Sequence, residues 1–378
     1  MKFVHLGDLH IGKRVNGFSM LEDQKYVLEQ ILKFLENNKQ DAVFIAGDIY
    51  DTQLPSIEAV RLFDKFLTKL SNLGTNIFII SGNHDSADRL AFAADLLSQS
   101  RVYISPVFNG NITATKMKDA YGYINIYMLP FIKPIHVKKI WPEEDIQTYD
   151  DAVKTVISKM SINPDERNVI IAHQFVTGAK TSDSEEISVG GIDNVSAENF
   201  LSFDYAALGH IHRSQSIGRK TIRYAGAPLK YSFSEYNNDK VITCVEIKAK
   251  GTAINISQKK LHPLRDMRKL RGQYMDLTLK SNYEGTRVDD YLAITLTDEN
   301  EIPDVIGKLR TIYPNIMKID YDNTRTRTAN MVDIDYKTLQ KSPIDMLNDF
   351  YLLQNNRSFS QQQYDFVESI IEEIWEEE

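Results

Sequence analysis

"NIFIISGNHD" (residues 76–85) joins an apolar run to a cluster of polar side chains. The run at 76–80 is typical of a buried strand, and glycine, asparagine and aspartate are ordinary turn formers. By itself the turn therefore indicates only that a strand ends there. Asn83, His84 and Asp85 can each bind a cation or move a proton, so the meaning of the turn depends on whether the design recurs.

The same design occurs five times in the first 212 residues, each time as an apolar run that ends in His, Asp or Asn. These runs alternate with helical patterns at 20–38 and 56–73, which indicates parallel strands in an α/β fold. Ligands of such sheets bind beyond the carboxyl ends of the strands. We therefore expect the five clusters to meet in space. They are Asp8 with His10, "DIYD" at 48–51, Asn83 with His84 and Asp85, His173, and His210 with His212.

Each cluster also has a purely structural explanation. An Asp after a strand can cap the next helix, and a His can satisfy buried carbonyl groups. We favour a functional site because five of the eight histidines fall at equivalent positions. Among the others, His5 is expected in the core, and His136 and His262 on the surface.

The ligand set combines carboxylates, imidazoles and an amide oxygen. Such a set suits Mn, Fe or Zn better than calcium. One carboxylate shared by two ions would hold them about 3.5–4 Å apart, the arrangement used to cleave phosphate esters.

Composition sets the broad class of the protein. A chain of 378 residues is expected to form two or three domains. The one cysteine, Cys244, excludes an intrachain disulfide and a cysteine-rich zinc module, which favours a reducing compartment. No apolar run approaches the roughly 18 residues that a membrane helix needs, and "MKFVHLGDLH" enters a strand pattern without a leader. We expect a cytoplasmic, nucleoid-associated protein without membrane contact.

The net charge of −8 lies in the C-terminal tail. Residues 343–378 hold nine acidic residues and one basic residue, and the other 342 residues hold 43 of each. The body of the chain can therefore present a basic groove to nucleic acid, although the whole chain is acidic.

The five motifs D-x-H, G-D-x-x-D, G-N-H-D, a lone His after a strand and G-H-x-H resemble those of calcineurin-like metallophosphoesterases. Segments 182–195, 203–215 and 224–240 are similar to the SbcD family, bacterial nuclease subunits homologous to the eukaryotic meiotic-recombination-eleven family. The likeness is detailed over residues 1–265. It implies an α/β sandwich of two central β-sheets flanked by helices, with a small α/β capping domain and C-terminal helices.

The resemblance also implies a role for each site residue. Asp8, His10 and His212 would bind one metal, Asn83, His173 and His210 the other, and Asp48 would bridge them. His84 would contact the scissile phosphate or protonate the leaving oxygen, with Asp85 orienting it. The family's usual cofactor is a pair of Mn²⁺ ions, with Mg²⁺ as the alternative. Its members degrade double-strand ends from 3′ to 5′ and cut single strands and hairpins.

Four basic residues beside the motifs are candidates for DNA phosphate contacts, with solvated surface charge as the alternative. They are Lys13, Arg14, Arg89 and Arg213. A phosphatase or small-molecule phosphodiesterase shares the five motifs and remains the competing function. A non-catalytic scaffold would be expected to have lost some ligands.

Downstream, the pattern predicts strands at 273–279, 290–298 and 316–322 and a helix at 302–313. We expect a nuclease domain at 1–265, a capping domain at 266–325, a linker at 326–341 and helices at 342–378. A stabilising accessory domain is the alternative to a cap.

The tail predicts two helices. Ser342 and Pro343 would begin the first, and Ser360 with Gln363 would form a capping box for the second. Val367, Ile370, Ile371 and Ile374 would form its apolar stripe. The resemblance implies that the tail binds SbcC, an ATPase with a long coiled coil, although it could instead pack on the body. It also implies a homodimer, joined through helices such as 56–70 and 88–97, within a heterotetramer.

Overall fold

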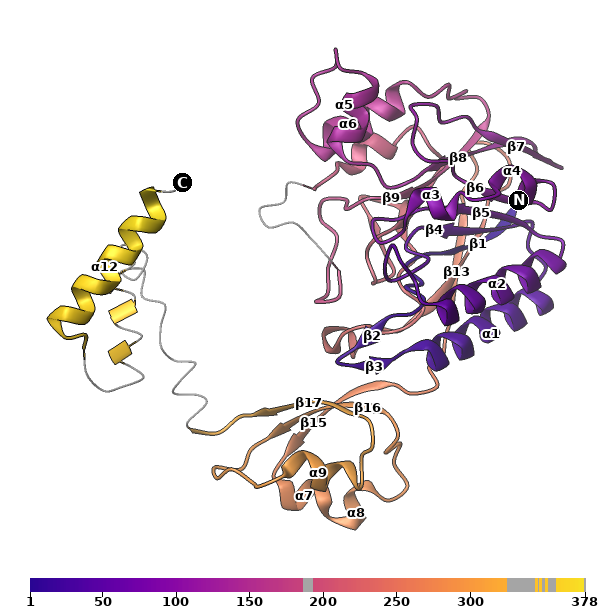
Figure 1. Cartoon of the computed structure of the whole chain (residues 1–378). Coiled ribbons are helices and arrows are strands. Elements are labelled where there is room, and N and C mark those ends of the chain that lie inside the picture. The colour runs from indigo at the N-terminus through magenta and orange to yellow at the C-terminus, as the bar shows by residue number, and fades with distance from the viewer. Residues whose placement is uncertain (186–192, 325–343, 346, 349–350, 353–357, 377–378) are drawn as a thin grey trace. The chain divides into compact units, whose positions relative to one another are not determined.

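The computed structural model describes residues 1–185, 193–324, 344–345, 347–348, 351–352 and 358–376 (Figure 1). The chain forms two compact units. The first consists of Met1–Thr295 and Ile302–Asp320, and the second of Leu296–Glu301 and Tyr321–Glu378. Within the described ranges, no helix has both the length and the apolar character needed to cross a membrane.

The first unit contains a six-stranded sheet that carries three of the five polar clusters. β1, β4, β5 and β6 are parallel, and β13 and β14 extend the sheet in antiparallel fashion. The runs expected as strands before Asp8, Asp48 and Asn83 are thus confirmed. In spatial order the strands are β14 (Asn255–Lys260), β13 (Val241–Glu246), β1 (Lys2–Leu6), β4 (Ala42–Ala46), β5 (Asn76–Ile80) and β6 (Val102–Ile104).

A second six-stranded sheet carries the other two clusters. Its four central strands β12, β10, β9 and β8 are parallel, so His173 and His210 lie at the carboxyl ends of neighbouring strands. In spatial order the strands are β11 (Gln215–Ile217), β12 (Arg219–Tyr224), β10 (Tyr205–Gly209), β9 (Arg167–His173), β8 (Gly122–Leu129) and β7 (Thr115–Asp119).

The two sheets pack face to face, with helices on the outer faces (Figure 1). Alternate residues of β4 show the layering: Phe44 lies in the core between the sheets, and Val43 and Ile45 face the helices. Each such burial contributes about 1.5–3 kcal/mol. The expected sandwich flanked by helices is confirmed. The helices are α1 (Leu21–Asn37) and α2 (Ile57–Asn72) on the first sheet, and α5 (Pro134–Ile140) and α6 (Tyr149–Ser158) on the second.

Short elements complete the first unit. The helix α2 begins as expected, with the Ser56 hydroxyl accepting a hydrogen bond from the Ala59 N–H at 3.2 Å. The other elements are the β2 (Arg14–Val15) and β3 (Phe18–Ser19) hairpin, α3 (Ala87–Leu90), α4 (Ala94–Ser98), η1 (Ala197–Phe200) and η2 (Phe233–Glu235).

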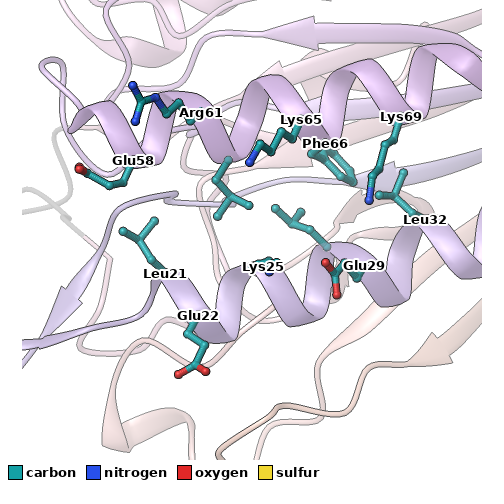
Figure 2. A pocket seen from close by; sticks show the side chains of 12 residues that line it. Leu21, Glu22, Lys25, Glu29, Leu32, Glu58, Arg61, Lys65, Phe66 and Lys69 are labelled. Carbon is teal, nitrogen blue, oxygen red and sulfur yellow. The ribbon is translucent and has the colours of Figure 1, made fainter.

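A groove of about 650 Å³ runs between α1 and α2. Figure 2 shows Arg61 and Lys65 on the α2 side and Glu29 on the α1 side of it. Its floor includes Leu28 and Phe66, which are already buried in the packing of this helix pair. Long charged side chains commonly cover such an apolar seam. The groove is therefore explained by helix packing, and the five polar clusters lie elsewhere.

Residues 267–321 form a three-stranded sheet with helices, in the spatial order β15 (Met267–Gly272), β16 (Tyr291–Leu296) and β17 (Ile316–Tyr321). The strands expected at 290–298 and 316–322 are confirmed, as is a helix within 302–313, α9 (Val305–Arg310). The strand expected at 273–279 is wrong: α7 (Tyr274–Thr278) occupies it and α8 (Lys280–Tyr283) follows. The place beside β16 is taken by β15, and a short apolar run alone does not separate helix from strand.

In the second unit, the capping box of α12 (Gln361–Glu376) is confirmed. The Ser360 N–H donates to Gln363 Oε1 at 2.9 Å, and the Gln363 N–H donates to Ser360 Oγ at 3.4 Å. The rings of Tyr351 and Phe359 lie 4.8 Å apart. The expected linker at 326–341, the helix start at 342–343 and the side chains of Ile371 and Ile374 lie outside the described residues.

The histidines outside the clusters lie as expected. His5 is fully buried, and its Nδ1 is 3.1 Å from the Tyr205 hydroxyl. Burial lowers the pKa of His5 to about 3, so it is a neutral core residue at physiological pH. His136 and His262 are exposed.

Candidate metal centre

The five polar clusters meet at one edge of the sandwich, where the carboxyl ends of the parallel strands lie. One donor group comprises Asp8, His10 and His212. The Nε2 atoms of His10 and His212 face each other at 3.0 Å, although 202 residues separate them in the chain. Asp8 Oδ1 accepts the His210 N–H at 2.7 Å, and Asp8 Oδ2 is buried with no hydrogen-bond partner among the described residues.

A second donor group comprises Asn83, His173 and His210. Asn83 Oδ1 lies 3.0 Å from His173 Nε2 and 3.0 Å from His210 Nδ1. The other nitrogen of His173, Nδ1, lies 2.8 Å from the carbonyl oxygen of Ala46. That contact places a proton on Nδ1, so Nε2, which faces Asn83, is the nitrogen that a cation can bind once it has lost its own proton.

Asp48 lies between the two groups. Its Oδ2 is 3.4 Å from His10 Nε2 and 3.3 Å from His173 Nε2. The same oxygen thus faces one imidazole of each group, as expected for a bridging carboxylate. The buried Asp8 oxygen, the facing imidazole nitrogens and the Asn83 amide oxygen bring several potential ligand atoms close together, so the set fits divalent cations.

Backbone strain is concentrated at this edge. Asp8, His10, Asp48 and His210 have φ angles of 53°, 44°, 51° and 101°. Positive φ costs of the order of 1–3 kcal/mol for a residue with a side chain, and the surrounding packing must enforce it. Such strain is typical of functional sites.

Two glycines of the motifs are required because a side chain at either position would clash with neighbouring atoms. A Cβ on Gly209 would lie 1.8 Å from the Ala46 carbonyl oxygen. A Cβ on Gly82 would lie 2.1 Å from Asp48 Oδ1. The glycines before His210 and Asn83 therefore let the strand ends approach closely enough to bring the donors together.

Burial and mutual charge set the protonation of the cluster before a cation binds. Burial raises the pKa of Asp8 to about 8. Burial alone would lower the pKa of His173, but the Asp48 carboxylate raises it to about 9. Burial alone would raise the pKa of Asp48, but the facing His173 holds it well below its usual range. Burial lowers the pKa of His10 to about 4 and of His210 to about 3. At neutral pH, His10 and His210 are neutral, and Asp8 and His173 hold protons.

Cation affinity is therefore expected to rise with pH. Both raised pKa values mean that Asp8 and His173 are protonated below about 8 and 9, and each must lose its proton to ligate. Mn²⁺ titrated calorimetrically into the full chain from about pH 6 to about pH 9 should bind more tightly at the higher pH. Buffers with different protonation enthalpies should reveal proton release. Affinity independent of pH, with no proton release, would contradict this protonation scheme.

His84 is more accessible than His10, His173 and His212, with its side chain 13% exposed against 0–2% for those three. Its Nδ1 lies 2.9 Å from the carbonyl oxygen of Asp51, and its Nε2 lies 4.0 Å from Asp48 Oδ2. The carbonyl can only accept, so Nδ1 carries a proton and Nε2 is directed toward the donor groups.

The expected role of Asp85 needs correction. Its carboxylate accepts the N–H groups of Ile49 at 3.1 Å, Tyr50 at 3.0 Å and Gly82 at 2.9 Å. Both oxygens are thus used by backbone donors, and the His84 ring is held at Nδ1 by Asp51. Burial raises the pKa of Asp85 to about 6 against these hydrogen bonds. Asp85 fixes the loop that carries His84 and does not orient its ring by direct contact.

The ring of His212 is backed by polar residues that the sequence does not reveal. Ser184 Oγ lies 2.7 Å from His212 Nδ1 and donates to Glu235 Oε1 at 2.7 Å. Glu235 is buried and paired with Lys240, which outweighs burial and keeps the pKa of Glu235 below its usual range. Ser184 and Glu235 belong to conspicuous family segments, but the sequence gives no indication that these two residues meet at His212.

The four basic residues expected to contact DNA differ in exposure and in their contacts. Lys13 is 15% exposed, and its Nζ donates to Asp51 Oδ1 at 2.6 Å. Arg14, in the β2–β3 hairpin, and Arg89, in α3, are exposed, as is Arg213 after His212. The structure thus brings Lys13 into the cluster and leaves the three arginines on the surface.

Comparison with known proteins identifies the family. The family model for calcineurin-like phosphoesterase matches residues 1–214. A model described as the type 5 capsule protein repressor C-terminal domain matches residues 263–355. A dimetal phosphatase from Danio rerio is 12% identical with a TM-score of 0.46, over 70% of this chain and 98% of its own.

A curated relative from Staphylococcus epidermidis, named as the D subunit of the nuclease SbcCD, is 32% identical over 382 residues, which cover all of both chains. Identity at this level along the whole length reaches beyond the phosphoesterase motifs into the C-terminal modules. The chain belongs to the calcineurin-like phosphoesterases and, within them, to the SbcD family.

Proposed function

We propose that the chain is a metal-dependent DNA nuclease that processes DNA ends in recombination, repair and replication together with an SbcC-type ATPase. The observation that carries the proposal is the pair of donor groups joined by Asp48 Oδ2. The full-length likeness to a protein named as part of the nuclease SbcCD supports DNA as the substrate.

Two divalent cations would be held by the two donor groups, Asp8, His10 and His212 on one side and Asn83, His173 and His210 on the other. Asp48 would serve both. Mn²⁺ suits this mixture of imidazole, carboxylate and amide oxygen, and Mg²⁺ is the alternative. When bound, such a pair neutralises phosphodiester oxygens and makes hydroxide available near neutral pH.

His84 is proposed as the general acid. With Nδ1 donating to the Asp51 carbonyl, a proton on Nε2 can pass to the leaving ribose oxygen. A ribose alkoxide is a poor leaving group, so a positioned acid contributes about 10²–10⁴-fold. Asp85 supports this role by fixing the backbone at 82 and 49–50.

The function is tested with a blunt duplex, a hairpin and a phosphomonoester, each with Mn²⁺ and with or without the partner ATPase. We expect Mn²⁺-dependent removal of nucleotides from the 3′ end, cutting of single strands and hairpins, and ATP stimulation in the complex. Hydrolysis of the monoester with intact DNA would instead favour the phosphatase alternative, which shares the same motifs.

DNA binding by the surface arginines is tested through salt. Replacing Arg14 and Arg213 together by Ala should weaken duplex binding for every DNA sequence. The slope of the logarithm of the binding constant against the logarithm of salt concentration should become less steep by about 0.9 for each phosphate that is no longer neutralised. Lys39→Ala is the matched control, since Lys39 is exposed before β4 at the opposite edge of the sheet. Fluorescence anisotropy at several salt concentrations measures both. An unchanged slope in the double variant would show these arginines to be ordinary surface charges.

Residues 266–325 are proposed to cap the nuclease cleft.

The chain is proposed to pair as a homodimer. Support for pairing comes from exposed apolar side chains on and beside the helices expected to mediate it: Leu54, Ile57, Val60, Phe92 and Leu96. An obligate monomer in sedimentation at micromolar concentration would argue against the dimer.

The tail, residues 342–378, is proposed to dock on SbcC. In α12 the apolar Phe366 is 65% exposed and Ile370 39% exposed, which suits a helix face laid in a partner's groove. Deleting 342–378 should leave a folded, metal-binding nuclease that no longer co-elutes with SbcC. Phe366→Asp with Ile370→Asp should do the same, and Gln362→Asp should not. A truncated chain that still co-elutes at full stoichiometry would place the main docking surface elsewhere.

A further inference from the structure

Asp51 lies where three of the strand-end loops meet. Its N–H donates to the carbonyl oxygen of Ile11 at 3.3 Å, which ties the loop after β4 to the loop after β1. Its carbonyl accepts from the ring of His84, in the loop after β5. Among the described residues, Asp51 belongs to neither donor group, so its side chain is available for another task.

The Asp51 carboxylate faces the outer nitrogen of His10. Asp51 Oδ1 is 3.4 Å from His10 Nδ1, whereas His10 Nε2 faces the donor group. A separation of 3.4 Å is long for a hydrogen bond, so the contact is principally electrostatic. A negative charge at that position favours the proton on Nδ1 and leaves the Nε2 lone pair for a cation, as carboxylates behind ligating histidines do.

The backbone carbonyl of Asp51 orients the ring of His84 in the same way. The Asp51 carbonyl oxygen is 2.9 Å from His84 Nδ1, and Nε2 of that ring is turned toward Asp48. One residue therefore holds two imidazoles in the same tautomer, with different atoms for each.

Lys13 holds the carboxylate in place. Its Nζ lies 2.6 Å from Asp51 Oδ1, the oxygen that faces His10. Its ammonium is also 5.7 Å from the centroid of the Tyr231 ring, and that ring packs edge-on against His10 with 5.7 Å between centroids. Lys13, Asp51, His10 and Tyr231 thus form one packed group in which the Asp51 charge is neutralised and fixed.

We propose that Asp51 is a positioning residue whose carboxylate orients the metal ligand His10 and whose carbonyl orients the acid His84, with Lys13 securing the carboxylate. The inference rests on the proposed function, because it assigns Asp51 its role through His10 and His84. A single variant can distinguish the effect on His10 from the effect on His84, because replacing the Asp51 side chain removes the contact to His10 and keeps the backbone carbonyl that contacts His84.

Asp51→Ala is therefore expected to weaken Mn²⁺ binding about 10- to 100-fold, the usual cost of losing a partner behind a metal ligand. DNA cleavage should fall at limiting Mn²⁺ and recover when Mn²⁺ is raised to saturation, because His84 keeps its contact. Asp51→Asn keeps an oxygen that can face Nδ1 but loses the charge. Its affinity should lie between those of the parent and Asp51→Ala.

Calorimetric titration of the full chain with Mn²⁺ measures the affinities, and cleavage as a function of Mn²⁺ concentration measures the rescue. Asp64→Ala, which removes an exposed carboxylate from α2, is the matched control. Parent-like affinity in Asp51→Ala overturns the role toward His10, and activity that stays low at saturating Mn²⁺ overturns the role toward His84. If Asp51→Ala does not fold, Asp51→Asn decides alone, since unchanged affinity there overturns the proposal. A parent chain that binds Mn²⁺ but does not cut DNA refutes the function and leaves the affinity comparison valid.

Discussion

His84→Ala is expected to cut DNA about 10²–10⁴-fold more slowly than the parent chain while binding the same two cations. His84 Nδ1 is committed to the Asp51 carbonyl, and Nε2 is 4.0 Å from Asp48 Oδ2, longer than the 3.3–3.4 Å at which His173 and His10 face that oxygen. Although His84 lies close enough to His10 and Asp48 to form a candidate cation-binding group with them, its longer separation from Asp48 favours the acid role, so its loss should remove proton transfer and keep the proposed ligands.

Single-turnover cleavage at saturating Mn²⁺ and calorimetric stoichiometry measure the two effects separately. A substrate with a better leaving group than a ribose alkoxide should recover much of the lost rate, because it needs less protonation. His136→Ala is the control, since His136 is an exposed histidine outside the clusters. A loss of one cation in His84→Ala would make His84 a ligand and refute its assignment as the acid.

Asp48→Ala is expected to abolish cleavage by a different route, through loss of both cations. Asp48 Oδ2 faces an imidazole of each donor group, His10 at 3.4 Å and His173 at 3.3 Å. Its removal also takes away the Oδ1 that accepts the His84 N–H at 3.0 Å. Cation stoichiometry, measured by calorimetry and elemental analysis, should fall for both sites at Mn²⁺ concentrations that saturate the parent chain.

Two variants sharpen the interpretation of Asp48→Ala. Asp48→Asn keeps an acceptor for the His84 N–H and removes the charge, so it should retain the fold and still bind Mn²⁺ poorly. Asp88→Ala removes an exposed carboxylate in α3 and should behave like the parent chain. Full occupancy of one site in Asp48→Ala would show that Asp48 serves a single cation.

Sequence predicted the strand ends well because parallel strands impose a geometric rule. Apolar runs before Asp8, Asp48 and Asn83 end at the same edge of one sheet, and those before His173 and His210 at the same edge of the other. Cation-binding side chains that follow these strands therefore lie close together, because the carboxyl ends of the strands lie side by side. The sandwich and its donor set were therefore predictable from residue type and position.

The contacts behind the ligands were not predictable in the same way. Asp85 and Asp51 are both aspartates in strand-end loops, and only the structure shows that the first accepts backbone N–H groups and the second holds the two imidazoles. Ser184 and Glu235 reach His212 from segments 51 residues apart. Such roles depend on loop conformation, which no residue spacing encodes. The helix α7, expected as a strand, shows the same limit for a short apolar run.

The arrangement of two cations around Asp48 is tested most directly by anomalous scattering from crystals of the full chain grown with Mn²⁺. We expect two Mn²⁺ peaks about 3.5–4 Å apart, both within ligand distance of Asp48. One should lie against Asp8, His10 and His212, and the other against Asn83, His173 and His210. A single peak, or two peaks that do not share Asp48, would contradict the two-cation site on which the proposed nuclease activity depends.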